Sequence, residues 1–172
     1  MVSDSAGTSE WPDGGFPGIR INPKTLMPQL VNEEACAAAL AASTDPTDRI
    51  FVRLVEGHPG EAAELLAEAR YKDPDSFRLR MFEAEVLRVS HRFDRAVELY
   101  RQLLAEAQGT PEEAAVRQHL GRSHFAAGNI AAAVESFAKA LDLRVAGAAD
   151  ASLIYSSTVA LQRARDVLDL AC

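Results

Sequence analysis

Four histidines and two cysteines are the side chains of this 172-residue sequence best suited to metal binding or nucleophilic catalysis. His119 and His124 are five positions apart, so they do not share one helix face as a pair of metal ligands would. His58 and His91 stand in predicted turns between helices, near carbonyl groups that favour a donor. The sequence contains no G-x-S-x-G, H-E-x-x-H or C-x-x-C motif. We therefore predict no catalytic, metal-binding or cofactor-binding residue and no enzyme activity.

The charge, the cysteine content and the apolar runs of the sequence argue against several further classes of protein. Asp and Glu outnumber Lys and Arg by 25 to 18, whereas a nucleic-acid binder needs a basic surface. Cys36 and Cys172 are too few for a disulfide framework or a four-ligand zinc site. The longest nearly pure apolar run, residues 35–42, is far shorter than the ~18 residues that span a membrane, and residues 1–10 lack the features of a secretory signal. We expect a cytoplasmic protein that binds neither nucleic acid nor membrane.

Residues 1–30 differ in composition from the rest and form a Pro/Gly-rich leader. No helical period runs through its four prolines, so we expect it to be extended or flexible and to contain no paired strands. Two interpretations remain open: part of the leader lies on the helical body, or it is a short linear motif that docks elsewhere. Both use its sizeable apolar residues, which are Trp11, Phe16, Ile19, Ile21, Leu26 and Met27.

From residue 31 to 172 alanine and leucine dominate, and apolar residues recur at intervals of three and four, which predicts helices. Gly57 and Gly128 stand where helices should end. Thr110 and Glu113 have the spacing of a capping box, in which hydroxyl and carboxylate bond each other's backbone N–H groups. Predicted helix-capping residues are Asn32, Asp45, Ser76, Thr110 and Asp150. The sequence therefore predicts an all-α body.

A repeated small–large pattern is the main feature of this body. Ala62, Ala96 and Ala133 are 34 and 37 residues apart, and each is followed four positions later by a large residue, namely Leu66, Tyr100 and Phe137. The alanines allow two helices to approach closely, and the large residues fill the gap on the same face one turn later. Ala84 and Gly121 are the small residues expected opposite them. One helix pair cannot bury its apolar face alone, so we expect the pairs to stack.

This pattern resembles the tetratricopeptide repeat family, in its bacterial-type form, over about residues 43–145. The residues that carry the resemblance are Pro74, Leu120, Gly121, Gly128, Ala133, Phe137 and Ala140. The resemblance implies an all-α, right-handed α-α superhelix of stacked helix-turn-helix repeats. The three repeats would cover about 43–76, 77–110 and 111–147, followed by a C-terminal capping helix over 149–170.

The capping helix is predicted from an apolar stripe and a polar side. The stripe comprises Leu153, Ile154, Ser157, Leu161 and Ala164, and the polar side comprises Gln162, Arg163, Arg165 and Asp166. This helix would cover the exposed face of the last repeat. In the alternative, it begins a fourth helix pair that a partner or a second copy of the chain completes.

The resemblance also implies a concave groove that holds an extended peptide, formed by the first helix of each pair. The groove residues implied by the repeat alignment are Phe51, Arg78, Met81, Phe82, Glu85, Arg88, Gln118, His119, Arg122 and Phe125. Arginine offers carboxylates a planar pair of donors, so Arg78, Arg88 and Arg122 favour a partner with acidic residues beside an apolar anchor. In the alternative, these arginines are solvated or paired with Glu85 and other carboxylates of the chain.

The function predicted from these features is protein–protein interaction, as an adaptor or scaffold that binds a protein or peptide segment. The alternative is a self-associating structural module, in which the leader or the C-terminal helix packs on another copy and makes a homo-oligomer.

Overall fold

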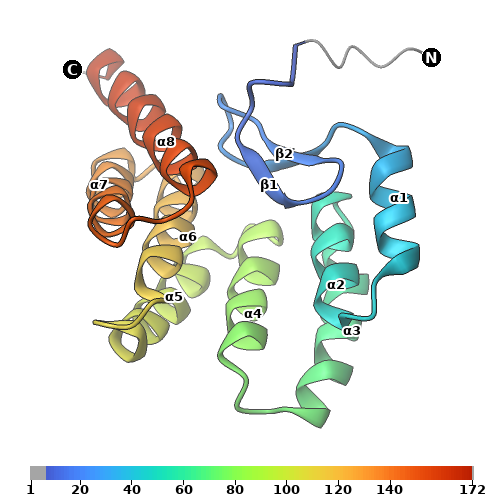
Figure 1. Cartoon of the computed structure of the whole chain (residues 1–172). Helices are drawn as coiled ribbons and strands as arrows, with labels where there is room; N and C mark the ends of the chain where they lie inside the picture. The colour runs from blue at the N-terminus through green and yellow to red at the C-terminus, as the bar shows by residue number, and fades with distance from the viewer. Residues whose placement is uncertain (1–6, 172) are drawn as a thin grey trace. The chain divides into compact units, whose positions relative to one another are not determined.

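The computed structural model describes residues 7–171, and in this range it contains three short strands and eight α-helices (Figure 1). The elements are β1 (Asp13–Phe16), β2 (Ile19–Ile21), β3 (Pro28–Leu30), α1 (Glu33–Ala42), α2 (Pro46–Val55), α3 (Pro59–Lys72), α4 (Phe77–Val89), α5 (Phe93–Ala107), α6 (Glu113–Ala126), α7 (Ile130–Ala146) and α8 (Ala151–Leu170). The chain divides into two compact units. Among the described residues, unit 1 contains residues 7–22 and Pro28–Arg92, whereas unit 2 contains Pro23–Met27 and residues 93–171.

The prediction that no strands pair is wrong for the leader. The three strands form one antiparallel sheet in the order β1-β2-β3, and Ile21 lies opposite Pro28. Strands of three and four residues are too short to show the alternation by which a strand is recognised in a sequence. Gly18 has a φ of +80°, and a Cβ there would lie 2.3 Å from the backbone oxygen of Asn32, so glycine is required at this turn.

The sheet packs on the first helices of unit 1. Ile19 of β2, Cys36 of α1 and Val52 of α2 form one buried cluster, joined by the half-buried Phe16 and Leu30. Burying these side chains stabilises the sheet, because so small a sheet is marginal in water without an apolar surface to cover. Burial raises the pKa of the Cys36 thiol. Cys172 lies outside the described residues.

Most predicted helix boundaries are confirmed. Asn32, Asp45 and Ser76 precede α1, α2 and α4, and each accepts a hydrogen bond from a backbone N–H of the first turn. Gly57 and Gly128 have positive φ angles just after α2 and α6, as expected of helix-ending glycines. The all-α prediction is thus confirmed for the body of the chain, and the sheet is a minor addition.

Two predicted caps are wrong in detail. Helix α6 begins at Glu113, so Thr110 is not its cap; the Thr110 hydroxyl donates to the carbonyl of Ala107 at 2.6 Å and accepts from the Glu112 N–H at 3.3 Å. The Glu113 carboxylate accepts from the backbone N–H of Gly109 at 3.0 Å, and this bond, with the contribution of Arg117, lowers its pKa. Asp150 stands at the N-terminus of α8, but its side chain makes no capping bond there.

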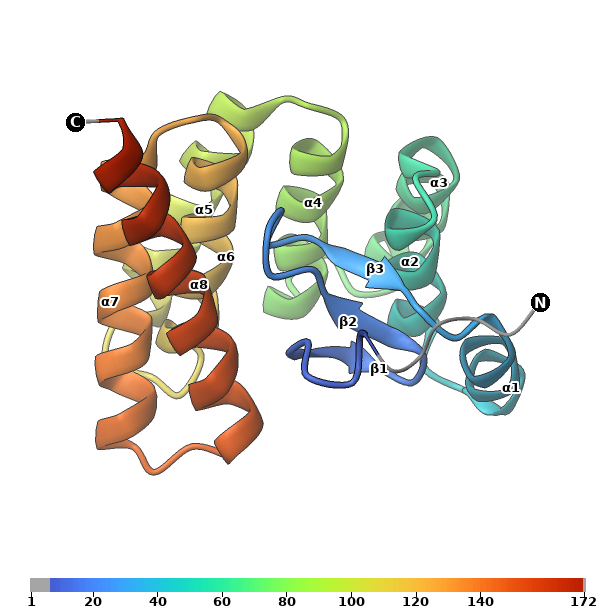
Figure 2. The ribbon, with the colours of Figure 1, turned by 90° about the horizontal axis from the view of Figure 1, so that it is seen from above.

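The small–large pattern is confirmed as a packing pattern. Ala62, Ala96 and Ala133 are fully buried, and so are Tyr100 and Phe137 four residues after the last two. In unit 1, α2 packs on α3 and α3 on α4; in unit 2, α5, α6, α7 and α8 pack in succession (Figure 2). The second predicted pair is divided, because α4 belongs to unit 1 and α5 to unit 2.

The predicted stripe of α8 is largely confirmed. Ser157, Leu161 and Ala164 are buried, whereas Leu153 is 43% exposed. Leu153 lies in the first turn of α8 and bonds α7 through its carbonyl rather than its side chain. On the side predicted to be polar, Arg163 is half-buried, because its guanidinium bonds the carbonyl of Lys24.

Gly121 gives a first stability prediction. A Cβ at this position would lie 2.6 Å from the Phe137 ring atoms Cδ1 and Cε1, so Gly121→Ala forces the ring or α6 to move. Overpacking of this kind costs ~1–3 kcal/mol, and the better helix propensity of alanine returns about 1 kcal/mol. We therefore expect a net loss of about 1 kcal/mol, measured as a lower urea midpoint for α6 and α7 when unfolding is followed by hydrogen exchange.

The matched control is Gly60→Ala in α3. A Cβ at Gly60 meets nothing within 4 Å, so the helix propensity of alanine should raise stability there. A Gly121→Ala protein that gains stability as the Gly60→Ala protein does would contradict the tight contact with Phe137.

No helix among residues 7–171 combines the length and the hydropathy that crossing a membrane requires. In the same part of the chain, no three His, Cys, Asp or Glu side chains come together as ligands for a metal ion.

Candidate functional site

A surface of unit 2 formed by α6, α7 and α8 holds a segment of the chain itself. Leu26, from the loop Pro23–Met27, is only 1% exposed. It belongs to the same apolar cluster as Leu161 and Ala164 of α8, and Phe125 of α6 packs against that cluster. We call this surface, made of Phe125, Ala160, Leu161, Arg163 and Ala164, the loop site.

The loop site also binds the main chain of the loop. The Nε of Arg163 donates to the carbonyl oxygen of Lys24 at 3.0 Å, two residues before the buried leucine. The side chains of Lys24 and Thr25 are exposed, whereas the Leu26 side chain and the Lys24 carbonyl contact the helices of unit 2. A surface that recognises a short segment in this way combines an apolar anchor with a polar contact that fixes its orientation.

A buried polar network lies between α6, α7 and α8. The Arg144 guanidinium donates to Ser157 Oγ at 2.8 Å and to the carbonyl of Leu153 at 3.1 Å, and Ser157 Oγ donates to Gln118 Oε1 at 2.8 Å. Burial lowers the pKa of Arg144, and no carboxylate of the described residues lies within ion-pair distance of it. Gln118 Nε2 is buried without a hydrogen-bond partner in the structure. The network therefore holds a buried cation by neutral acceptors alone.

The groove residues predicted for unit 2 have different surroundings. Phe125 packs against the cluster that contains Leu26, and Gln118 joins the buried network. The His119 ring is stacked on Tyr100 of α5, with 6.0 Å between ring centroids. Arg122 is buried. Of the four, Phe125 is the one at the loop site.

The groove residues predicted for unit 1 are mostly involved in contacts within the unit. Phe51 packs against the cluster beside the sheet, and Phe82 against the cluster between α2, α3 and α4. Arg88 pairs with Glu85 at 2.6 Å, with both side chains buried, and the exposed Arg78 lies 3.5 Å from an oxygen of Asp45. Met81 is half-buried. These pairings agree with the alternative in which the arginines bind carboxylates of the chain.

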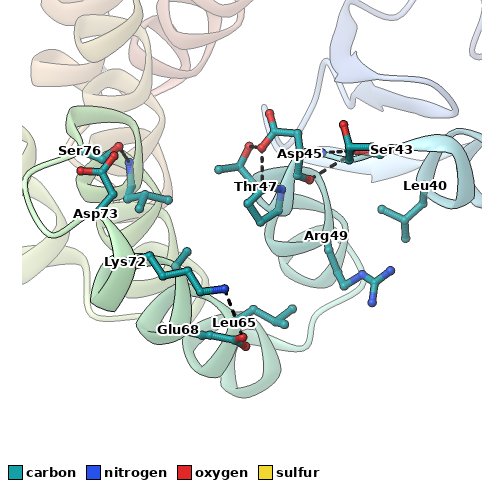
Figure 3. Close-up of a pocket in the computed structure, with 14 residues that line it drawn as sticks. Leu40, Ser43, Asp45, Thr47, Arg49, Leu65, Glu68, Lys72, Asp73 and Ser76 are labelled. Carbon is teal, nitrogen blue, oxygen red and sulfur yellow. Dashed lines mark hydrogen bonds and ion pairs between the residues drawn. The ribbon is translucent and has the colours of Figure 1, made fainter.

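A pocket of about 510 Å³ in unit 1 was not predicted from the sequence. It lies where α1 ends, α2 and α4 begin and α3 ends, and Figure 3 draws the residues that line it. Leu40, Leu65 and Leu79 supply apolar lining. The sequence signal was the presence of capping residues, Asp45 and Ser76, at the starts of two neighbouring helices.

The polar groups of this pocket are used in capping and do not form a catalytic arrangement. Asp45 accepts from the Thr47 N–H at 2.9 Å and from the Thr47 hydroxyl at 2.7 Å, and these bonds lower the Asp45 pKa. A carboxyl group held ionised in this way is a poor general acid. Ser76 accepts from the N–H of Leu79, and Lys72 lies 3.9 Å from Glu68. The pocket thus reflects how the helix ends meet.

His124 gives a second prediction, on the pH dependence of stability. Burial, with a smaller contribution from Arg101 of α5, lowers the His124 pKa, and Glu135 of α7 opposes this. The unfolded chain therefore takes up the proton more readily than the folded chain. Stability should fall as the pH drops from about 7.5 to about 5.5, through the ordinary histidine pKa.

The measurement is the urea midpoint of α6 and α7, followed by hydrogen exchange at the two ends of this pH range, for the wild type and for His124→Gln. Both proteins keep the other three histidines, so the difference between their pH dependences reports position 124. We expect a smaller drop for His124→Gln, and equal drops would show that this imidazole does not titrate differently on folding.

The folds of the two units define a protein built of repeated helix pairs, with small residues where the helices cross. Models of the tetratricopeptide repeat match residues 54–120 and residues 119–171. The chain belongs to the tetratricopeptide repeat family. No curated protein and no solved structure matches it. Repeats of this family generally mediate protein–protein interaction, and neither matching model describes an enzyme family.

Proposed function

We propose that the chain is a non-catalytic adaptor that binds a short segment of a partner protein at the loop site. The observation that carries the proposal is the burial of Leu26 at this site together with the bond from Arg163 to the Lys24 carbonyl. The surface can thus accommodate a polypeptide segment through a contact that any main chain can offer and through one apolar anchor. The chain belongs to a family whose repeats generally mediate protein–protein interaction, and this supports the proposed adaptor function.

The preferred partner segment carries a large aliphatic side chain. An acidic neighbour was expected from the arginines, but a carboxylate from a partner would compete with Asp45 for Arg78 and with Glu85 for Arg88. The buried Arg88–Glu85 pair is costly to separate, because each charge would lose its partner inside the protein. We therefore base the proposal on the apolar anchor and the main-chain bond, and an acidic residue is a secondary feature of the partner.

The test is selection of peptides from a random displayed library on two full-length proteins, the wild type and Leu26→Ser, which empties the anchor position. Selected peptides should share a large aliphatic residue. Their affinity should fall about ten-fold in Arg163→Ala, since a hydrogen bond to a charged donor contributes ~1.5 kcal/mol.

Arg165→Ala is the matched control, because Arg165 is an exposed arginine on the same helix. The proposal fails if neither protein selects peptides, or if the selected peptides bind the Arg163→Ala and Arg165→Ala proteins equally.

The alternative function, self-association, is favoured by the distribution of exposed apolar side chains. Among the described residues, six large apolar side chains are exposed, and all but Tyr71 lie on the last two helices: Leu143, Val145, Leu153, Tyr155 and Leu170. A concentration of exposed apolar side chains on two neighbouring helices is a feature that interaction surfaces share.

Sedimentation of the full chain tests this alternative. A wild-type dimer that becomes a monomer in the double variant Leu153→Ser, Tyr155→Ser would support contact through α8. A monomeric wild type at all concentrations would exclude it.

A further inference from the structure

The loop Pro23–Met27 joins two strands of unit 1, yet it packs as a part of unit 2. Its flanking residues, Ile21 and Pro28, are paired in the sheet. Between them, Leu26 is buried in the cluster of α7 and α8, while Lys24 and Thr25 are exposed. The loop therefore contributes a single side chain to a core that is otherwise built from helices.

The backbone of Leu26 has an unfavourable conformation. Its φ angle is +61°, in the left-handed region, where the Cβ of any residue except glycine approaches the following carbonyl oxygen. A leucine keeps such a conformation only where the surroundings compensate, and here the compensation is burial of its side chain at the loop site. The seated loop is thus less stable than an unstrained segment with the same anchor would be.

We infer that Pro23–Met27 is a built-in ligand of the loop site, which a partner segment must displace. This inference rests on the proposed function and adds the regulation and the preferred shape of the ligand. The partner segment would present a large aliphatic side chain two residues after a carbonyl that bonds Arg163, as Leu26 and Lys24 do. A partner segment that makes these contacts without a left-handed backbone would bind the loop site more tightly than the loop does.

Tethering sets how strongly the loop competes. A segment attached by a short linker has an effective concentration in the millimolar range, so even a weak internal ligand reduces the apparent affinity of a free one. The apparent affinity of a partner then increases when the loop is weakened. This is the property that separates a displaceable ligand from a permanent part of the core.

The first experiment measures binding of a fluorescent peptide with the sequence of residues 22–29 to three full-length proteins: the wild type, Leu26→Ser and Lys24→Gln. The peptide should bind Leu26→Ser at least about ten-fold more tightly than the wild type, because the internal competitor has lost its anchor. Lys24→Gln should behave as the wild type does, because its exposed side chain is changed and its carbonyl is kept. A peptide with Ser in place of Leu26 should bind none of the three.

Equal affinity of the peptide for the wild type and Leu26→Ser, or no binding to either protein, overturns the inference. If peptides selected from the library bind both proteins equally, the loop does not compete but the proposed function stands. If no peptide is selected on either protein, the proposed function itself fails. The two failures are therefore distinguishable.

A second measurement keeps Leu26 in place and so does not depend on folding of the Leu26→Ser protein. An environment-sensitive dye is attached at Thr25→Cys, an exposed loop position, in a chain with Cys172→Ser; Cys36 is buried. Addition of a library-selected peptide should change the dye signal with the same midpoint as peptide binding. Binding without any change of the signal would show that the loop stays seated and would overturn the inference.

Discussion

Phe137→Ala is expected to lower the free energy of unfolding by ~3–5 kcal/mol. The ring is fully buried in the cluster that also contains Ala133, Ala160 and Leu161, and the backbone of Gly121 lies against it. Truncation removes the ring from helices that cannot move closer without breaking their other contacts, so a cavity remains.

Hydrogen exchange resolved to α6, α7 and α8 is the appropriate measurement, because the chain has two compact units and a single unfolding midpoint need not report unit 2. Tyr71→Ala is the matched control, since this aromatic side chain is 90% exposed and its loss should change stability by less than about 0.5 kcal/mol. Similar effects of the two changes on exchange in α7 would contradict the packing role of Phe137.

The helical repeats could be predicted because their signals are local. Ala133 and Phe137 are one turn apart, and Asp45 and Ser76 cap helices that begin at the next residue. A pattern confined to about one helical turn can be recognised in the sequence without knowledge of the tertiary structure. Family resemblance strengthened these signals, and the matching family models confirm them over residues 54–171.

The features that could not be predicted depend on residues far apart in the sequence. Arg163 and Lys24 are separated by 139 positions, and nothing near either residue indicates their hydrogen bond. The sheet was missed because each strand gains its stability from Cys36 and Val52 on helices, rather than from its own few residues. The division into two units at Arg92 was missed because the repeat pattern runs through that point without interruption.

Only part of the candidate site could be predicted, because its contacts also join residues that are far apart in the sequence. The repeat alignment identified Phe125, which lies at the loop site, but it also included Phe51 and Arg88, which pack or pair within unit 1. An alignment of repeats indicates which helix face a residue occupies, whereas the partner that covers this face is decided by the tertiary structure. Leu161 was predicted to be buried as part of a capping stripe, and the segment that helps to bury it, the loop with Leu26, was not anticipated.

Ser157→Ala is expected to be the second most damaging change, with a loss of about 3 kcal/mol in the free energy of unfolding. Its hydroxyl is the acceptor for a guanidinium that has no carboxylate partner in the described part of the chain, and it is also the donor to Gln118. Removing one oxygen atom therefore leaves two buried polar groups less satisfied, and one of them is charged. A lost bond costs most in this situation, because neither group can recover it from water.

Ser156→Ala is the matched control on the same helix. Ser156 is also buried, but no hydrogen bond of its hydroxyl is found among the described residues, and alanine brings the same gain in helix propensity at both positions. When urea unfolding is followed by hydrogen exchange in α6 and α8, the free energies of unfolding of the two variants should differ by more than about 2 kcal/mol. Equal stabilities would mean that Arg144 finds another acceptor, and the network would then not be what connects α6, α7 and α8.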